Sequence, residues 1–338
     1  MKRVLASLAA LAVAAFCASP VQAQEDGSFF NGKTIRILVG FPPGGAYDFY
    51  ARLGADMLKA HIPGLESAIV ENKLGAGGLV ATNFLYEQGS KDGLTLGVLP
   101  DTIANTQLID PSNSKWDVRQ FRYIGSFSSV NSAVLRRANS PAKSLEDMKQ
   151  REIIVGCSGR NAQSYQFPAM LAALGGYKFK MICGYTGAQG YSIALERGEI
   201  DMVSSAWATW RVTHRGQMDR GEMVPVFQIG LRRTAELPDT PLMQELVTDP
   251  VARQAIEFVS AGTAIGRALT APPGVPEARI EYLRKAFDRM TSDPEMKAMA
   301  EKRNLILDPT SGKETQAISD AIVSTPKNII DLAATAFK

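Results

Sequence analysis

Short apolar runs alternate with stretches of helical periodicity along most of this chain. The run at residues 37–39 is followed by Pro and Gly pairs at residues 42–45, which predicts a buried strand that ends in a loop. From residue 48 onward apolar residues recur at helical spacing. The order at this point is therefore strand, glycine-rich loop and helix.

The same order repeats through the chain. Strands are predicted at residues 34–41, 68–72, 94–99, 121–127, 133–137, 153–157, 180–184, 202–205, 224–229 and 265–269. Helices are predicted at residues 48–61, 79–88, 144–149, 162–174, 188–197, 242–247, 251–260 and 277–290, with two further amphipathic stretches after them. This alternation predicts an α/β fold with mostly parallel sheets that are covered by helices on both faces.

A single sheet of so many strands is improbable, so the pattern favours two α/β lobes. We place the crossings between the lobes near residues 126–130 and 229–233. The first lobe is then discontinuous, with residues 24–127 and 232–338, and the second lobe holds residues 128–231.

The first 23 residues have the pattern of a cleaved signal peptide. Lys2 and Arg3 precede an apolar run over residues 4–16, and residues 21–23 form an Ala-x-Ala-like cleavage site. A lipid anchor at Cys17 is disfavoured, because the bulky residue before it does not fit a lipid-attachment signal. No later stretch reaches the roughly 18 apolar residues of a membrane helix. The sequence predicts an exported protein, which is periplasmic if the source is a bacterium with two membranes.

Charge and cysteine content narrow the class of protein further. Removal of Lys2 and Arg3 takes the basic residues from 37 to 35, against 34 acidic residues. This near-balance argues against a nucleic acid as the partner, because nucleic acids bind concentrated basic patches. Only Cys157 and Cys183 remain after cleavage. In an oxidising compartment they either pair or stay as two buried thiols, and the sequence favours neither.

Glycine-rich loops follow the first two predicted strands. The first loop contains Gly44 and Gly45, and the second spans residues 75–78. A helix N-terminus presents unpaired backbone N–H groups and the positive end of its dipole, and glycine lets a ligand approach the backbone closely. Because the carboxyl ends of parallel strands share one edge of the sheet, both loops are predicted to form an anion site there.

Further motifs accompany these loops through the chain. They are Phe41-Pro42-Pro43-Gly44-Gly45 with Asp48 and Arg52, Val70-Glu71-Asn72 with Gly75-Ala76-Gly77-Gly78, Asp92-Gly93 with Thr95-Leu96, Gly198 with Asp201, Leu237-Pro238 with Thr240-Pro241 and Glu245, and Ala271-Pro272-Pro273-Gly274-Val275-Pro276. Together they resemble the extracytoplasmic solute receptors of tripartite tricarboxylate transporters, the Bug-type binding proteins. The resemblance covers nearly the whole chain after the signal peptide.

The resemblance implies a type II periplasmic binding fold, in which two α/β lobes close on a ligand in the cleft between them. It implies that the ligand is a small organic carboxylate, held by backbone amides and ordered water rather than by an arginine. It also implies delivery to a two-component, ion-coupled carrier in the membrane. The alternative is a receptor that presents the bound acid to a membrane sensor kinase. We expect a monomer.

The second lobe is expected to supply the opposite wall of the site. Loops at residues 158–163 and 185–188 each follow a predicted strand and open a helix. The candidate ligand-binding residues of both lobes are Phe41, Gly44, Gly45, Ala46, Asp48, Gly75, Ala76, Gly77, Gly78, Ser158, Gly159, Asn161, Ala162, Thr186, Gly187, Ala188, Ser205 and Trp207.

Several roles stay open at this point. A carboxylate repels an acid but complements a helix dipole, so Asp48 either organises the loop amides or contacts a hydroxyl or amine of the ligand. Trp207 either forms an aromatic wall beside the ligand or packs in the core. Arg160 and Arg211 are candidates to pair with a second carboxylate, although most arginines are solvated. Residues 160–164 are bulkier and more polar than the resemblance implies, which leaves the identity of the ligand open.

The sequence offers no support for an enzyme, a cofactor or a metal site. His61 and His214 are the only histidines, and neither has a second ligand at the spacing typical of a metal site. The sequence also contains no nucleophile-elbow motif and no dinucleotide-binding fingerprint. Residues 27–34 fit the phosphate-loop pattern, but that loop needs a strand before it and a helix after it. Here a strand is predicted to follow, so we interpret the match as chance.

Overall fold

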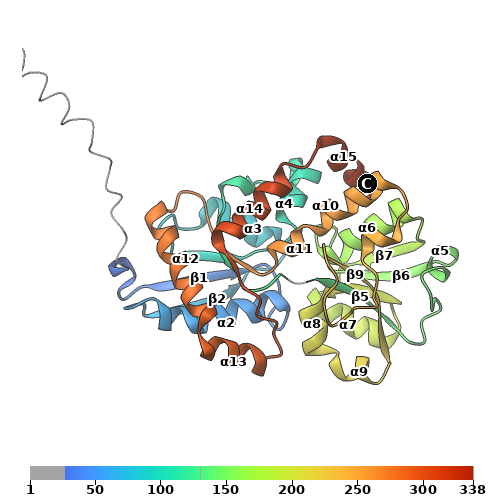
Figure 1. Cartoon of the computed structure of the whole chain (residues 1–338), viewed down its shortest axis with the longest axis horizontal. Helices are drawn as coiled ribbons and strands as arrows, with labels where there is room; N and C mark the ends of the chain where they lie inside the picture. The colour runs from blue at the N-terminus through green and yellow to red at the C-terminus, as the bar shows by residue number, and fades with distance from the viewer. Residues whose placement is uncertain (1–26, 130, 338) are drawn as a thin grey trace, which may run out of the picture.

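Two sheets form the centres of two lobes that lie side by side (Figure 1). The computed structural model describes residues 27–129 and 131–337, and the predicted signal peptide at residues 1–23 lies outside these ranges. Within them, no helix has both the length and the apolar character that a membrane span needs. The predicted arrangement of two α/β lobes is confirmed.

The first sheet has the strand order β11-β4-β10-β3-β1-β2. Its strands are β1 (Thr34–Val39), β2 (Ser67–Asn72), β3 (Thr95–Val98), β4 (Arg122–Ser126), β10 (Ala268–Ala271) and β11 (Thr310–Ser311). β1 pairs in parallel with β2 and β3, whereas β10 is antiparallel to β3 and β4. β11 is antiparallel to β4 as well, so only two of the five pairings between these strands are parallel and the expectation of a mostly parallel sheet is wrong here. Both antiparallel strands, β10 and β11, belong to the segment that returns from the other lobe.

The second sheet has the strand order β7-β6-β8-β5-β9. Its strands are β5 (Ser132–Arg137), β6 (Ile153–Cys157), β7 (Phe179–Cys183), β8 (Met202–Ala206) and β9 (Met223–Ile229). β6 is parallel to β7 and β8, and β5 is antiparallel to β8 and β9. All five strands come from one continuous segment, and the lobe boundaries given above stay a prediction.

Helices surround both sheets. The α-helices are α2 (Ala46–His61), α3 (Leu79–Gln88), α4 (Ile103–Ile109), α5 (Asp147–Gln150), α6 (Gln163–Gly175), α7 (Gly187–Arg197), α8 (Trp207–Thr213), α9 (Arg215–Asp219), α10 (Pro250–Ser260), α11 (Gly262–Ile265), α12 (Glu277–Ser292), α13 (Pro294–Lys302), α14 (Gly312–Val323) and α15 (Lys327–Thr335). Short 3-10 helices are η1 (Ser28–Phe30), η2 (Ala76–Gly78), η3 (Pro111–Asn113), η4 (Val118–Gln120) and η5 (Met243–Leu246).

The hydrophobic pattern located the long helices well and the short ones poorly. It predicted α2, α3, α6, α7, α10 and α12, but it missed α4 and α8, each of which has 7 residues. A periodic stripe is hard to recognise over two turns. The strand predicted at residues 265–269 starts later, as β10, because α11 and a turn at Gly266 with φ 60° come first. Residues 27–34 lead into β1, which agrees with a chance match to the phosphate-loop pattern.

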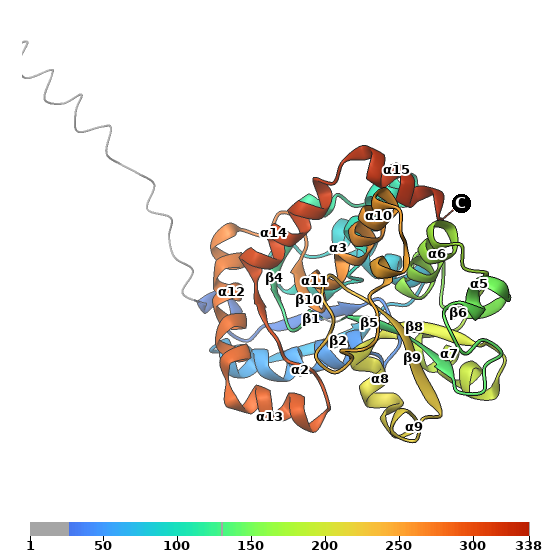
Figure 2. The same ribbon diagram turned by 45° about the vertical axis from the view of Figure 1, so that its right-hand side comes forward.

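The C-terminal part of the chain joins the two lobes. α10 packs against α6 of the second lobe and against α15, and α15 also contacts α4 of the first lobe. α10 and α15 lie beside each other in both Figure 1 and Figure 2. α10 therefore lies at the junction between the lobes, and Phe337, after α15, also reaches the second lobe, where Arg160 donates to its carbonyl oxygen.

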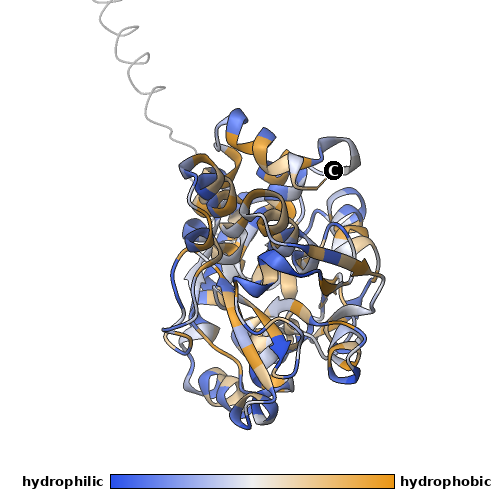
Figure 3. Cartoon of the chain, turned by 90° about the vertical axis from the view of Figure 1, so that its right-hand side faces the viewer, coloured by the Kyte–Doolittle hydropathy of each residue, from blue (hydrophilic) through white to orange (hydrophobic). Residues whose placement is uncertain are grey.

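Alternating faces of strands and helices build the hydrophobic core. On β1 the side chains of Ile35, Ile37 and Val39 are fully buried, and they belong to the same cluster as Tyr50 and Leu53 of α2. Figure 3 shows hydrophobic and hydrophilic colour mixed along the helices, as expected for helices with one buried face.

Cys157 and Cys183 form a disulfide between neighbouring strands β6 and β7. The two residues are partners in the parallel register, and their Cα atoms lie 4.3 Å apart. Cys157 is buried and Cys183 is exposed on β7, the edge strand of the sheet. Of the two possibilities left open by the sequence, a disulfide and two buried thiols, the structure has the disulfide.

We expect loss of this disulfide to destabilise the protein. The cysteines are 26 residues apart, and the chain-entropy model then gives about 3.5 kcal/mol of stabilisation. Urea unfolding of Cys157→Ala/Cys183→Ala should show a loss of about this size in the free energy of unfolding. Dithiothreitol should destabilise the wild type to the same level and leave the variant unchanged. Equal midpoints for the oxidised wild type and the variant would contradict the prediction.

Candidate ligand-binding site

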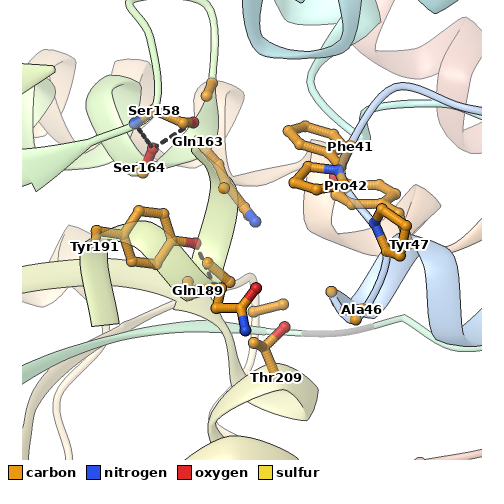
Figure 4. A pocket seen from close by; sticks show the side chains of 18 of the residues that line it. Phe41, Pro42, Ala46, Tyr47, Ser158, Gln163, Ser164, Gln189, Tyr191 and Thr209 are labelled. Carbon is orange, nitrogen blue, oxygen red and sulfur yellow. Dashed lines mark hydrogen bonds between the residues drawn. The ribbon is translucent and has the colours of Figure 1, made fainter. Parts of the chain in front are cut away.

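A cavity of about 50 Å³ lies between the two lobes. The first lobe lines it with residues 41–47 and with Arg267, and the second lobe lines it with residues from α6, α7, β8 and α8. In Figure 4 the side chains of Phe41 and Tyr47 lie on one side and those of Gln163 and Tyr191 on the other. The cavity is thus built from both lobes.

Three helices of the chain begin at this cavity. α2, α6 and α7 have 16, 13 and 11 residues and follow strands β1, β6 and β7. Their first turns contribute to its lining Ala46 and Tyr47, Gln163 and Ser164, and Ala188 and Gln189. N–H groups in a first turn have no acceptor within the helix, and the positive dipole ends of all three helices favour a negative charge. The site is therefore suited to an anion.

Asp48 organises the first glycine loop from behind and does not line the cavity. Its carboxylate accepts hydrogen bonds from Gly44 N at 3.0 Å, from Arg52 Nε at 2.9 Å and from Asn72 Nδ2 at 3.0 Å. Asn72 Nδ2 also donates to Phe41 O at 2.8 Å, which connects the ends of β1 and β2. Burial by itself would raise the pKa of Asp48, but these hydrogen bonds together lower it below its usual value. Of the two open roles, the contacts favour organisation of the loop.

The second glycine loop contacts the opposite lobe. Gly77 has φ 66°, and a Cβ atom added to it would lie 3.0 Å from Ala162 N and 3.1 Å from Asn161 C. Only a residue without a side chain allows this approach with no displacement. Gly75, Ala76, Gly77 and Gly78 are not among the lining residues of the cavity.

A second close contact joins the lobes on the other side of the first loop. A Cβ added to Gly187, which has φ 59°, would lie 2.8 Å from Pro42 Cγ. The lobes are therefore in close contact at Gly77, which meets backbone atoms of Asn161 and Ala162, and at Gly187, which meets the ring of Pro42.

An ion pair lies buried at the first-lobe side of the cavity. Arg267 Nη1 donates to Asp101 Oδ2 at 2.7 Å, and Tyr47 Oη donates to Asp101 Oδ1 at 2.9 Å. The guanidinium carbon of Arg267 lies 4.0 Å from the centroid of the Tyr47 ring. Arg267 is 0% exposed and Asp101 is 1% exposed. Burial acts to lower the pKa of Arg267, but Tyr47 and Asp101 more than offset this and raise it, so the guanidinium stays charged.

Hydroxyl and amide groups line the second-lobe side. Tyr191 Oη donates to Ser205 Oγ at 3.0 Å, and burial raises the pKa of Tyr191 to about 12. Ser158 N donates to Ser164 Oγ at 3.1 Å. Neutral polar groups of this kind orient a ligand without adding charge.

The structure brings half of the candidate residues together at the cavity. Those that line it are Phe41, Gly44, Gly45, Ala46, Ser158, Ala162, Gly187, Ala188 and Ser205. The others lie outside its lining, namely Asp48, Gly75, Ala76, Gly77, Gly78, Gly159, Asn161, Thr186 and Trp207. Trp207 is 6% exposed and donates from Nε1 to Glu236 Oε2 at 2.6 Å, so its side chain packs in the core.

Sequence reasoning missed several lining residues. They are Pro42, Pro43, Tyr47, Gln163, Ser164, Gln189, Tyr191, Ala206, Thr209 and Arg267. Most of them lie within two residues of a candidate, so a wider window around each loop would have included them. Arg267 has no such signal, because it contacts the site from a distant part of the chain.

The arginines and histidines that were considered from the sequence lie elsewhere. Arg160 donates to Phe337 O, and Arg211 pairs with Glu236 at 3.2 Å. His61 contacts Asp293, and neither histidine lines the cavity. In the ranges that the structure describes, no group of His, Cys, Asp and Glu side chains is arranged to hold a metal ion.

Comparison with known proteins decides the family. The family model for the tripartite tricarboxylate transporter family receptor matches residues 60–332. The chain belongs to this family. A relative from Cupriavidus necator, the UPF0065 protein in the gbd 5' region, is 27% identical over 295 residues, which are 85% of this chain and 82% of that protein.

Solved structures of similar proteins share the fold of this receptor. The periplasmic binding protein BugD has a TM-score of 0.69 at 21% identity, covering 90% of this chain and 97% of BugD. MatC from Rhodopseudomonas palustris with bound malate has a TM-score of 0.68 at 18% identity, covering 88% of this chain and 99% of MatC. The predicted two-lobed periplasmic binding fold is confirmed. Because members of the family are solute receptors, the prediction that the chain is not an enzyme is confirmed as well.

The contacts of Asp48 predict how a substitution would affect stability. Asp48→Asn should lower the free energy of unfolding at pH 7 by about 2–3 kcal/mol, because hydrogen bonds to a buried carboxylate are lost. The folded-state pKa of Asp48 is depressed, so its contribution is complete above the unfolded pKa of about 3.9 and is lost as the pH falls through the lower folded value. The difference between wild type and variant should shrink as the pH falls below about 4.

Urea unfolding at several pH values would test this prediction. The control is Asp56→Asn on the same helix, where the aspartate side chain is 51% exposed and pairs with Arg303. A surface pair of this kind contributes about 0–1 kcal/mol. Equal effects of the two substitutions would rule out the structural role of Asp48.

Proposed function

We propose that this receptor captures a small organic carboxylate between its lobes and delivers it to the membrane subunits of a tripartite tricarboxylate transporter. The observation that carries the proposal is the convergence of the N-termini of α2, α6 and α7 on one cavity. Family membership supports the transporter as the partner. Malate bound to MatC, which shares the fold, supports a carboxylate as the ligand.

Interactions at the cavity have the strength that capture requires. A micromolar dissociation constant corresponds to about −8 kcal/mol. Hydrogen bonds to a charged group contribute roughly 1.5–3 kcal/mol each, less the cost of ordering the ligand and the lobes. A few first-turn N–H groups and hydroxyls therefore suffice for binding in this range.

Closure of the lobes follows from the same geometry. The loop that begins at Phe41 lines the cavity and also contacts Gly187 of the other lobe through Pro42. A ligand that touches both lobes binds the closed arrangement more tightly than an open one and so stabilises it. We infer that the membrane subunits recognise this closed form on the periplasmic side, which the N-terminal signal pattern supports.

In this proposal some candidate residues contact the ligand and others serve closure of the lobes. The lining residues of the first loop and of the α6 and α7 starts contact the acid. Gly77 with Asn161 and Ala162 forms the closing contact, and Asp48 holds the first loop in shape. Trp207 stabilises the core next to Ser205.

Binding of acids should be visible as a gain in thermal stability. A ligand at 100 times its dissociation constant stabilises the folded state by about 2.7 kcal/mol. We expect at least one acid among propionate, benzoate, succinate, malate and adipate to raise the melting temperature well above the effect of sodium chloride at equal ionic strength. If every acid behaves like chloride, the proposed function fails for these ligands.

Closure should depend on the absence of a side chain at Gly77. Asn tolerates the left-handed backbone, so Gly77→Asn should fold but hold the lobes apart at Ala162. Overpacking of about 1–3 kcal/mol corresponds to roughly 5- to 150-fold weaker binding of the acid. Isothermal titration calorimetry with the acid that stabilises the wild type most would measure the loss.

Gly176 offers a matched control for this substitution. Its φ and ψ are 72° and 21°, against 66° and 24° at Gly77, and no atom lies within 4 Å of a Cβ added there. Gly176→Asn should therefore have the same local strain and bind normally. Equal affinities of the two variants would show that the Gly77 contact is not needed for closure.

A further inference from the structure

Gln163 points a side-chain amide nitrogen into the cavity between the lobes. It is the first residue of α6, it lines the cavity and it is partly exposed, so a ligand can reach its side chain. Its Nε2 atom carries two N–H donors, and neither has a hydrogen-bond partner within residues 27–129 and 131–337. In Figure 4 the nitrogen end of this side chain points toward the loop that holds Phe41 and Pro42.

Ser132 holds the amide of Gln163 in this orientation from behind. Ser132 Oγ donates to Gln163 Oε1 at 2.6 Å. Ser132 is fully buried, and its hydroxyl has no other hydrogen bond in the part of the chain that the structure describes. Because a buried hydroxyl proton needs an acceptor, the oxygen of the amide faces Ser132 and the nitrogen faces the cavity. Ser132 does not line the cavity, so it is a positioning residue.

The start of α6 adds further donors beside this amide. The backbone N–H groups of Gln163 and Ser164 have no acceptor among the described residues, as expected for the first turn of a helix. The described residues that line the cavity also include no acidic side chain that would repel an oxygen of the ligand. An acceptor oxygen, and best a charged one, is therefore the group that fits at this place.

The first lobe faces the ligand with a different set of groups. It lines the cavity with residues 41–47 and with Arg267. None of these described residues has a side-chain donor that is both unpaired and accessible, because Tyr47 Oη donates to Asp101 and Arg267 is fully buried. The donors that remain on this side are backbone N–H groups at the start of α2, which suit a carboxylate. The two lobes are thus suited to two different ends of one ligand.

We propose that Gln163 selects small acids that carry a second acceptor oxygen at the end opposite the first carboxylate, as dicarboxylates do. The first carboxylate lies at the start of α2, and Gln163 Nε2 donates to an oxygen at the other end. This proposal rests on the proposed function and deepens it, because it names the class of acid. An acid with an apolar end removes water from Nε2 without supplying an acceptor, so it binds more weakly.

The experiment compares dicarboxylates with monocarboxylates of the same shape. In each pair an isopropyl group replaces the second carboxylate, which gives malonate with isovalerate, succinate with isocaproate, and adipate with 6-methylheptanoate. Isothermal titration calorimetry with the full receptor measures the affinity for each acid. We expect the wild type to bind the best dicarboxylate at least about tenfold more tightly than its branched partner, because only the dicarboxylate supplies an acceptor to Nε2.

Substitutions at Gln163 and Ser132 test where this preference comes from. Gln163→Met keeps the length of the side chain but has no donor, so the affinity for the dicarboxylate should fall roughly 10- to 100-fold while the affinity for the branched monocarboxylate stays the same. Ser132→Ala leaves Gln163 in place but lets its amide rotate. The affinity for the dicarboxylate should then fall by roughly 2- to 10-fold, which is the cost of ordering one side chain.

A matched control comes from the same lobe. Gln217 donates from Nε2 to Glu196 Oε1 and does not line the cavity. Gln217→Met should therefore keep the ratio of the two affinities that the wild type shows. If Gln163→Met does not fold, Gln163→Glu keeps the shape of the side chain and replaces the donor nitrogen by a charged oxygen. This variant should lose the preference for the dicarboxylate through repulsion.

The outcomes separate this inference from the proposed function. If no acid binds the wild type, the proposed function fails for these ligands, and the inference fails with it. If acids bind but the wild type holds each branched monocarboxylate as tightly as its dicarboxylate, the inference is overturned and the proposed function stands. If Gln163→Met weakens both members of a pair by the same factor, Gln163 only maintains the shape of the site, and the inference is again overturned.

Discussion

The carboxyl ends of strands from both sheets face each other across the cavity, and most features of the site follow from this constraint. A strand that ends at this edge is followed by a helix that begins there, as in β1–α2, β6–α6 and β7–α7. Each helix contributes unpaired N–H groups and a positive dipole end. Two lobes of the same construction therefore place positive potential on both sides of one cavity, with no need for a cluster of cationic side chains.

The lobes are in close contact at two glycines, and in the proposed function this contact links ligand binding to the positions of the lobes. Gly77 approaches Ala162, and Gly187 approaches Pro42, while the loop that contains Pro42 also lines the cavity. A shift of this loop would therefore also change the contact between Pro42 and Gly187. Asp48 and Asn72 hold that loop by hydrogen bonds, so the geometry at which the lobes meet depends on residues that do not line the cavity.

Sequence alone predicted the parts of this structure that local patterns specify. The strand, loop and helix around Gly44 and Gly45 follow from apolar runs and turn residues, and so do most long elements. The role of Asp48 stayed open because its partner Asn72 lies 24 residues away. The pairing of Cys157 with Cys183 depends on the register of β6 and β7, and no local pattern specifies a register between strands.

Arg267 shows most clearly why part of the site could not be predicted from the sequence. Its ion pair joins residues 166 positions apart, and its surroundings combine the return strand β10 with the start of α2. Burying a charged pair costs several kcal/mol per ion before the two charges compensate each other, so this arrangement is a poor way to gain stability alone. Asp101 and Tyr47 offset part of that cost, because Asp101 accepts a hydrogen bond from Nη1 of Arg267 and the ring of Tyr47 lies against the guanidinium plane. The pair can form only when the segment after β3 and the segment before β10 are both in their final positions, so no local sequence pattern indicates it.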